Sequence, residues 1–288
     1  MVGSWITTAN KGNSHFANKH SKRVPHSSSI RNPNWRVQVF ISLPSSTTFS
    51  LTIPRTLSSA LSSLGTSTTS ACIFIYPGNY TGQTTINYGG PLTIYGYTTS
   101  AKDVSFNTVT FSNSLSSPAA GNLDASSTIQ VKGSYVKIYN INVENTYGKG
   151  AQAVALTANG NYLSFYACKF SGYQDTLYVK SGNQYFTHCY VEGAVDYIFG
   201  AANVWIGAST IASNGNGAIT ASSRETTDST WYVFDSSTIT AAPGDTTTGG
   251  VYLGRPWRVL ARVMYQNSVL DSVVNAAGWT TMAEGATP

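Results

Sequence analysis

Two aspartates recur at a fixed interval in matching segments of the chain. Asp175 closes the segment CKFSGYQD and Asp196 closes the segment CYVEGAVD, so the Cys, Gly and Asp of the first segment all return after the same interval in the second. Two carboxylates held close together repel each other, and one can then stay ionised while the other keeps a proton near neutral pH. The pair could therefore supply a nucleophile and a general acid, although an aspartate at a turn is more often structural.

Two amide side chains have the spacing to join this acid pair, and one guanidinium has the chemistry to do so. Gln152 precedes Gln174 by almost the interval that separates the two aspartates, so both amides would flank Asp175 on successive repeats. Amide N–H groups are the donors that a developing oxyanion requires. Arg255, in the segment LGRPW, could bind a carboxylate through two parallel hydrogen bonds and keep it ionised. The constellation is suited to ester hydrolysis.

Short repeated segments must position these side chains. A small-x-apolar pattern returns in steps of similar but variable length, and its copies start at Ile141, Cys168, Cys189, Ser209, Ser237 and Ser268. One strand signal in every 20 to 30 residues or so is typical of a solenoid, and residues one coil apart then stack at roughly 4.8 Å. Only 10% of the residues are charged, which disfavours long helices. We therefore expect an all-β, single-domain, right-handed parallel β-helix; a two-layer sandwich explains the variable steps less well.

Four longer motifs carry a resemblance to a known family. They are QAVAL (152–156), GYQDTLY (172–178), GAVDYIFG (193–200) and YLGRPW (252–257), with shorter matches at 78–80 and 219–224. In this order and spacing they closely resemble the signature segments of pectin methylesterases, and the Tyr of DYIFG is more similar to fungal members. The resemblance covers roughly residues 55 to 280. It implies hydrolysis of the methyl esters of homogalacturonan, the acidic chain of pectin, with release of methanol.

The resemblance also implies a role for each residue that matches the family's motifs. Asp196 would attack the ester carbonyl carbon, and Asp175 would protonate the departing methanol and then activate a water. The oxyanion would be stabilised by Gln152 and Gln174, while Arg255 would hold Asp196 charged. The substrate sugars would contact Tyr178, Phe199 and Trp257, and Arg224 would either bind galacturonate carboxylates or form a surface salt link. No metal or cofactor is implied, and none of the four histidines has ligand spacing.

The two ends of the chain depart from the family pattern. Residues 1–50 hold basic residues and no acidic ones, and we expect a disordered segment there, either a genuine extension or an artefact of the gene model. Residues 51–288 would form the β-helix, with a capping helix predicted from Leu57, Leu61 and Leu64. The last coil would be shortened and would expose apolar surface. The family's GxYxE pattern has Gly82 in place of Glu, which we interpret as a structural change.

Charge and cysteine content restrict the partners. The formal charge of +5 belongs to the N-terminal segment, because residues 61–288 carry ten basic and twelve acidic side chains, a net of −2. This charge distribution gives no reason to expect a nucleic acid, and no stretch is apolar enough for a membrane span. The resemblance implies pectin as the partner, and we expect a monomer. No signal peptide is visible, yet the resemblance implies secretion, and the sequon at Asn79 permits glycosylation. Stacked Cys168 and Cys189 would be either small ladder residues or a disulfide.

Three functions remain open from the sequence. The first is an active methylesterase, and the second is a related β-helix lyase or glycosidase that cleaves the sugar chain itself. A lyase would need a cluster of acids for Ca²⁺, which the sequence lacks, and a paired-acid glycosidase would not need Gln152 and Gln174. The third is an inactive or misfolded pectin-binding relative. A serine esterase is disfavoured because no G-x-S-x-G occurs.

Overall fold

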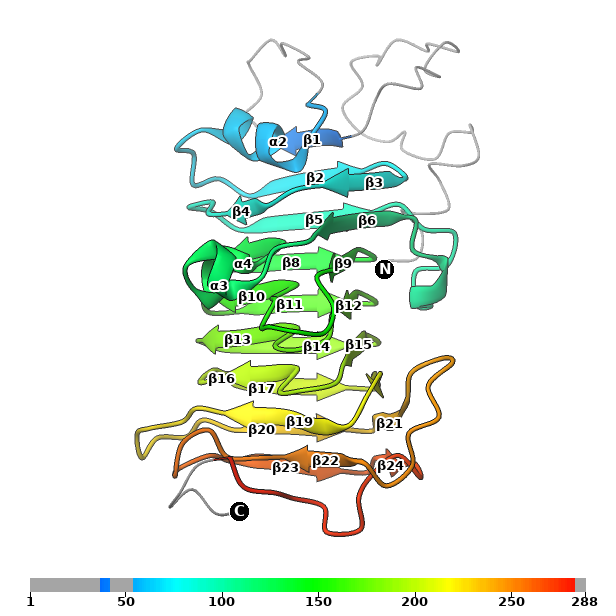
Figure 1. The fold of residues 1–288 in the computed structure, drawn as a ribbon. Helices are drawn as coiled ribbons and strands as arrows, with labels where there is room; N and C mark the ends of the chain where they lie inside the picture. The colour runs from blue at the N-terminus through cyan, green and yellow to red at the C-terminus, as the bar shows by residue number, and fades with distance from the viewer. Residues whose placement is uncertain (1–36, 42–53, 283–288) are drawn as a thin grey trace, which may run out of the picture.

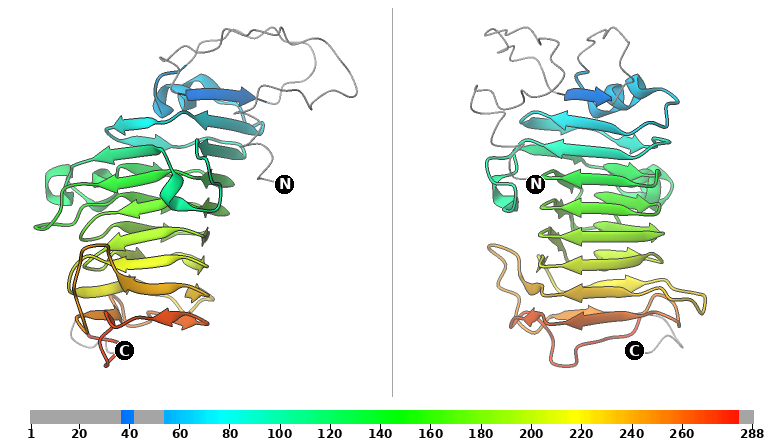
Figure 2. Two further views of the ribbon diagram at one scale, coloured as in Figure 1. Left: turned by 90° about the vertical axis from the view of Figure 1, so that its right-hand side faces the viewer. Right: turned by 180° about the vertical axis from the view of Figure 1, so that it is seen from behind.

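The chain winds into a parallel β-helix made of three long sheets. A computed structural model describes residues 37–41 and 54–282, and Figure 1 shows their strands stacked coil upon coil along one axis. Each coil contributes one strand to each sheet in turn, and the same strand of the next coil pairs with it in parallel. The two turned views in Figure 2 show the same stack from the side and from behind. The predicted fold class is confirmed.

The strands are assigned to sheets as follows. Sheet A contains β1 (Val37–Ile41), β2 (Ala71–Ile75), β5 (Leu92–Gly96), β8 (Val136–Tyr139), β11 (Leu163–Tyr166), β14 (Asn183–Thr187), β17 (Asn203–Gly207), β20 (Tyr232–Asp235) and β23 (Val263–Gln266). Sheet B contains β3 (Gly78–Thr81), β6 (Val109–Asn113), β9 (Asn142–Asn145), β12 (Lys169–Ser171), β15 (Tyr190–Gly193), β18 (Thr210–Ser213), β21 (Thr238–Ala241) and β24 (Val269–Leu270). Sheet C contains β4 (Thr84–Ile86), β7 (Ile129–Val131), β10 (Leu156–Asn159), β13 (Leu177–Ser181), β16 (Ile198–Gly200), β19 (Gly217–Ser222) and β22 (Val251–Gly254). The short helices are α2 (Leu57–Leu64), η1 (Val104–Phe106), α3 (Ser117–Ala120) and α4 (Leu123–Ser126).

The repeating pattern found in the sequence corresponds to one sharp turn per coil, between sheets A and B. A single residue with left-handed backbone stands at this turn in six successive coils, at Asn140, Ala167, His188, Ala208, Ser236 and Asn267, with φ between 47° and 56°. Each of them directly precedes the first residue of one small-x-apolar segment, so the turns and the pattern share the same variable spacing. The turn lets the chain change direction within one residue, so short strands can follow one another around the coil.

Alternating side chains fill the interior of the solenoid. In β2 the residues alternate between buried and partly exposed, as expected for a strand with one face on a core. Like residues stack from coil to coil: the rings of Phe165 and Phe186 lie 4.5 Å apart and nearly parallel. Cys168 and Cys189 are also buried in this interior, and both are free thiols, so the disulfide alternative is not realised. Burial raises the pKa of the Cys189 thiol well above its usual value.

Helix α2 covers the first coil, as predicted. Its N-cap Thr56 forms a capping box with Ser59, and the helix buries Leu57, Ala60 and Leu64. Within the segment expected to be disordered, Val37–Ile41 forms β1, which pairs antiparallel with β2 at the edge of sheet A. The rest of that segment lies outside the described residues. At the other end β24 is an edge strand, with Val269 and Leu270 exposed.

Candidate active site

The two aspartates stand on neighbouring coils, each in the turn from sheet B to sheet C. Asp175 lies between β12 and β13, and Asp196 lies between β15 and β16. The main chains of the two turns are joined by a hydrogen bond of 3.0 Å from Asp175 N to the oxygen of Val195 and by a parallel bridge between Gln174 and Val195. Both aspartates adopt left-handed backbone, with φ of 64° and 48°. The repeat therefore places the carboxylates side by side, as predicted.

Burial and neighbouring charges shift the pKa of Asp175. Asp175 and Asp196 are only 6% and 7% exposed. The pKa of Asp175 is raised to about 8, first by burial and then by the charge of Asp196, and Arg255 opposes part of this rise. A carboxyl with this pKa keeps its proton at neutral pH and can act as a general acid.

Arg255 binds the second acid of the pair. Its Nε and one terminal nitrogen donate to the two carboxylate oxygens of Asp196 at 2.7 and 2.6 Å, a bidentate ion pair. Arg255 follows β22, and its backbone nitrogen donates to the oxygen of Thr220 at 2.9 Å, which fixes the origin of the side chain beside sheet C. The guanidinium therefore pairs with both oxygens of Asp196 and fixes the orientation of that carboxylate.

The two glutamines extend the same ladder toward the N-terminus. Ala153 N donates to the oxygen of Gln174 at 3.0 Å, so Gln152 lies one coil before Gln174. Gln152 is exposed and Gln174 is partly exposed. Within the described residues neither side-chain amide makes a hydrogen bond, and their N–H groups remain available to an oxygen placed over Asp175. The structure thus brings together all five residues predicted for catalysis.

An aromatic cluster continues from the acid pair across the outer face of sheet C. The rings of Tyr178 and Phe199 stack at 4.4 Å, and Trp257 lies 6.2 Å from Phe199 at an angle of 52°. Tyr178 and Trp257 are partly exposed, as a substrate contact requires. Phe199 is only 1% exposed and packs against Val154, so the predicted sugar contact by this ring is wrong. Tyr178 and Trp257 cover the Phe199 ring, and Phe199 supports both of them from beneath.

Arg224 is also placed differently from the prediction. It is 3% exposed, and its guanidinium donates to Asp228 Oδ1, to the oxygen of Asp228 and to the oxygen of Leu260, each at 2.8 Å. These bonds clamp two neighbouring loops together. The prediction of a galacturonate contact is not supported, because the donors are occupied inside the protein; the alternative of a salt link is correct, although the guanidinium is buried.

A wall beside the acid pair has no counterpart in the sequence motifs. Helices α3 and α4 project beside β10 (Figure 1). Lys180 of β13 forms an ion pair with Asp124 of α4. Gln83 donates to the oxygens of Ala125 and Ser127 at 2.6 and 2.9 Å, which fastens the same wall. The Gln next to the altered GxYxE position is thus structural, and the φ of 97° at Gly82 favours glycine there. In the sequence, only the presence of Gln83 could have pointed to this contact with α4.

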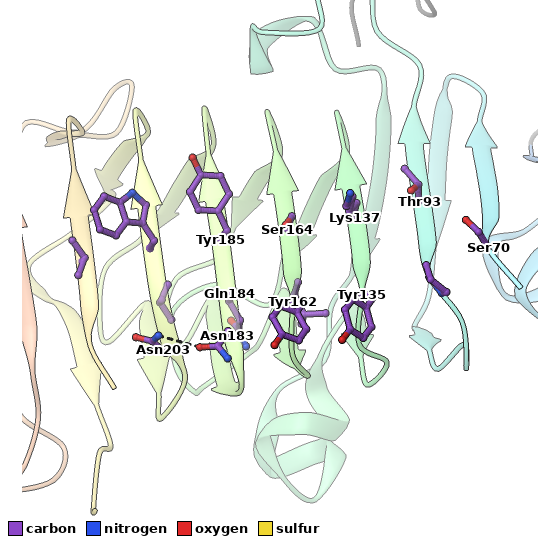
Figure 3. A pocket seen from close by; sticks show the side chains of 15 residues that line it. Ser70, Thr93, Tyr135, Lys137, Tyr162, Ser164, Asn183, Gln184, Tyr185 and Asn203 are labelled. Atoms are coloured by element: carbon purple, nitrogen blue, oxygen red, sulfur yellow. Dashed lines mark hydrogen bonds between the residues drawn. The ribbon is translucent and has the colours of Figure 1, made fainter. Parts of the chain in front are cut away.

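Two hollows on the described surface differ in their chemistry. One of about 310 Å³ is lined by Arg255, Pro256 and Trp279 and so adjoins the acid pair. A larger one of about 490 Å³ lies on sheet A, where Figure 3 shows Tyr185, Lys137 and Asn203 among the lining side chains. No carboxylate lines the larger hollow, so it lacks the groups for hydrolysis. Among the described residues no cluster of three or more His, Cys, Asp or Glu could hold a metal ion.

Comparison with known proteins decides the family. The model of the pectinesterase family matches residues 52–287. The chain belongs to the pectinesterase family. It is 59% identical over 234 residues to the probable pectinesterase A of Aspergillus niger, a match that covers 81% of this chain and 72% of that one. Pectinesterase A of Emericella nidulans is 57% identical over the same length and coverage.

Solved structures of pectinesterases share the fold. The crystal structure of the Aspergillus niger pectin methylesterase superposes with a TM-score of 0.80 at 59% identity, covering 80% of this chain and 78% of that one. The carrot enzyme gives a TM-score of 0.73 at 28% identity, with coverage of 80% and 74%. The predicted family and activity are therefore confirmed: the chain is a pectinesterase, a carboxylic ester hydrolase that removes methyl groups from pectin.

Proposed function

We propose that Asp196 is the nucleophile and Asp175 the general acid and base in hydrolysis of the methyl esters of homogalacturonan. The observation that carries this assignment is the asymmetry of the pair: Asp196 is bound at both oxygens by Arg255, whereas burial and the charge of Asp196 keep Asp175 protonated. A nucleophile must be ionised and a general acid must hold a proton, and this pair divides the two states as required.

The first half of the reaction forms a covalent intermediate. A carboxylate oxygen of Asp196 attacks the ester carbonyl carbon, and the carbonyl oxygen becomes an oxyanion within reach of the side-chain amides of Gln152 and Gln174. The carbon–oxygen bond to the methoxy group breaks as Asp175 transfers its proton to that oxygen, and methanol leaves. The galacturonate carbonyl is then bonded to Asp196 as a mixed anhydride.

The second half restores the enzyme. Asp175, now a carboxylate, takes a proton from a water molecule as the water oxygen attacks the anhydride carbonyl. The bond to Asp196 breaks, which releases the galacturonic acid group and returns Asp196 to its carboxylate form beside Arg255. The released acid then gives its proton to the solvent and becomes a carboxylate. The proton on Asp175 stands ready for the next ester. Tyr178 and Trp257, the two partly exposed rings, would border the bound sugar chain.

The proposal extends to secretion, oligomeric state and partners of the protein. We infer from the family that the protein is secreted. We also infer that it acts on pectin as a monomer, since all five site residues come from one chain and need no second copy. The net charge of −2 over residues 61–288 gives no support to nucleic-acid binding. Among the described residues, no helix is long and apolar enough to cross a bilayer.

The deciding experiment measures methanol released from methylated pectin by the wild type, Asp196→Ala and Asp175→Asn. We expect no turnover from either variant, with circular dichroism confirming that both are folded. Methanol from Asp196→Ala at the wild-type rate would remove the assigned nucleophile, and full turnover by Asp175→Asn would remove the assigned acid. Shortening of the pectin chain without methanol would indicate a lyase or glycosidase, and no reaction from folded wild type would indicate an inactive relative.

A further inference from the structure

A buried hydroxyl joins the two acid-bearing segments beneath the active site. Thr176 directly follows Asp175 and is fully buried. Its Oγ1 donates to the backbone oxygen of Glu192 at 3.0 Å. Glu192 belongs to β15, four residues before Asp196, so this bond connects the coil of one acid with the coil of the other.

Two glycines make room for this hydroxyl. A Cβ placed on Gly172 would lie 2.8 Å from Thr176 Oγ1, its nearest neighbour; a Cβ on Gly193 would lie 2.8 Å from the same atom and still closer, 2.3 Å, to Tyr197 Cβ. Each glycine stands three residues before one of the two aspartates, at the start of its turn. The Thr176 hydroxyl is therefore enclosed by both turns at once, closer than a larger residue at either glycine would allow.

We propose that Thr176 is a positioning residue that sets the separation between the Asp175 and Asp196 carboxylates through its hydroxyl. This inference rests on the proposed function of the acid pair. Without the hydroxyl, the Glu192 oxygen keeps its bond from Gly172 N, at 3.2 Å, but the direct side-chain link between the two turns is gone. The main-chain bond from Asp175 N to the oxygen of Val195 remains, so the turns stay stacked, but the acid side chains lose the side-chain support beneath them and can separate enough to admit water.

The expected consequence is a change in the proton affinity of Asp175. The charged and titratable groups that act on it are Asp196, Arg255 and Tyr178. Burial and repulsion from Asp196 raise its pKa, while Arg255 lowers it. Both raising effects weaken when the carboxylates separate and water enters, so Asp175 would lose its proton at a lower pH.

The chain offers a matched control for this bond. Thr128 is also fully buried, precedes a strand of sheet C, and donates from its Oγ1 to the oxygen of Glu144 at 2.8 Å. Glu144 occupies the third position of β9, as Glu192 occupies the third position of β15. The same hydroxyl-to-carbonyl bond thus occurs two coils away, under turns that carry neither aspartate.

The test measures methanol release against pH for Thr176→Val, Thr176→Ser and Thr128→Val. For Thr176→Val we expect the alkaline limb of kcat to move to lower pH by about half a unit, and kcat to fall by about tenfold or more with KM nearly unchanged. Thr176→Ser keeps the hydroxyl and should restore the wild-type profile. Thr128→Val should lower the melting temperature to a similar degree without moving the pH limb.

The outcomes separate this inference from the assignment of the acids. An unchanged pH limb in Thr176→Val, or the same shift in Thr128→Val, would overturn the positioning role. If Thr176→Val does not fold, Thr176→Ala removes the same bond with less added bulk and is judged by the same criterion. Full turnover by Asp175→Asn would instead overturn the acid–base role itself, whatever the Thr176 variants show.

Discussion

Replacement of Arg255 by Gln should reduce turnover strongly while leaving the fold intact. The guanidinium makes two bonds of 2.7 and 2.6 Å to Asp196, whose side chain is 9% exposed, and the Arg255 side chain is 30% exposed. Removing one member of a largely buried pair costs about 3 to 5 kcal/mol. Since Arg255 keeps some contact with water, we take the lower end, about 3 kcal/mol, as the loss.

This loss should appear in catalysis more than in unfolding. Without the guanidinium the Asp196 carboxylate loses the two bonds that orient it, so it is held less often in the position for attack. A loss of about 3 kcal/mol corresponds to a decrease of about a hundredfold in kcat/KM. The free energy of unfolding should fall less, because the Arg255 side chain is 30% exposed and water can replace part of its contact with the carboxylate.

Initial rates of methanol release, measured with melting temperatures, check this prediction. Arg262→Gln is the control, since Arg262 lies seven residues further along the chain and contacts Trp231 rather than the acid pair. Its rate should stay within about twofold of the wild type. Retention of more than a tenth of kcat/KM by folded Arg255→Gln would refute the view that the guanidinium holds the Asp196 carboxylate in its attacking orientation.

Two further predictions concern stability. The pKa of Asp175 is about 8 in the folded protein and about 3.9 in an unfolded chain, so the stability associated with its proton is complete below pH 4 and is lost as the pH rises to 8. Thermal melts of Asp175→Asn should lack this decline. A mutant that follows the wild-type curve would contradict the raised pKa. Arg224→Met should lower the melting temperature, because it leaves the Leu260 oxygen unpaired inside the protein, while KM for pectin stays unchanged. A KM that rises at constant melting temperature would restore Arg224 as a substrate contact.

The coil geometry made much of the site predictable. Residues one repeat apart in a solenoid stack on adjacent coils, so the pairing of Asp175 with Asp196 and of Gln152 with Gln174 follows from the repeat alone. The ion pair of Arg255 with Asp196 spans 59 residues; the residue type suggested that Arg255 binds a carboxylate, and only the family resemblance specified Asp196. The repeat alone also did not show which aspartate attacks, because that depends on burial and on the contact with Arg255.

The errors and omissions have a common physical origin. Phe199 and Arg224 lie within the motifs, yet the packing of neighbouring loops decides that both are buried, and a single sequence does not specify that packing. The wall fastened by Lys180 and Asp124 was missed for the same reason, since its contact joins segments 56 residues apart without a repeat to signal it. Strand β1 escaped notice because its pairing is antiparallel and outside the repeating coils.

The order of residues along the solenoid has a consequence for how the protein reaches its native state. Each coil depends mainly on its neighbours, so the turns of Asp175 and Asp196 can stack before the segment that carries Arg255 has been added. At that stage two carboxylates meet without their guanidinium, and a partly folded chain would hold them together more easily when protons are abundant. Refolding of the middle coils should therefore be faster in mildly acidic solution. At higher pH, the same two acids that divide the catalytic roles would slow the stacking of their coils.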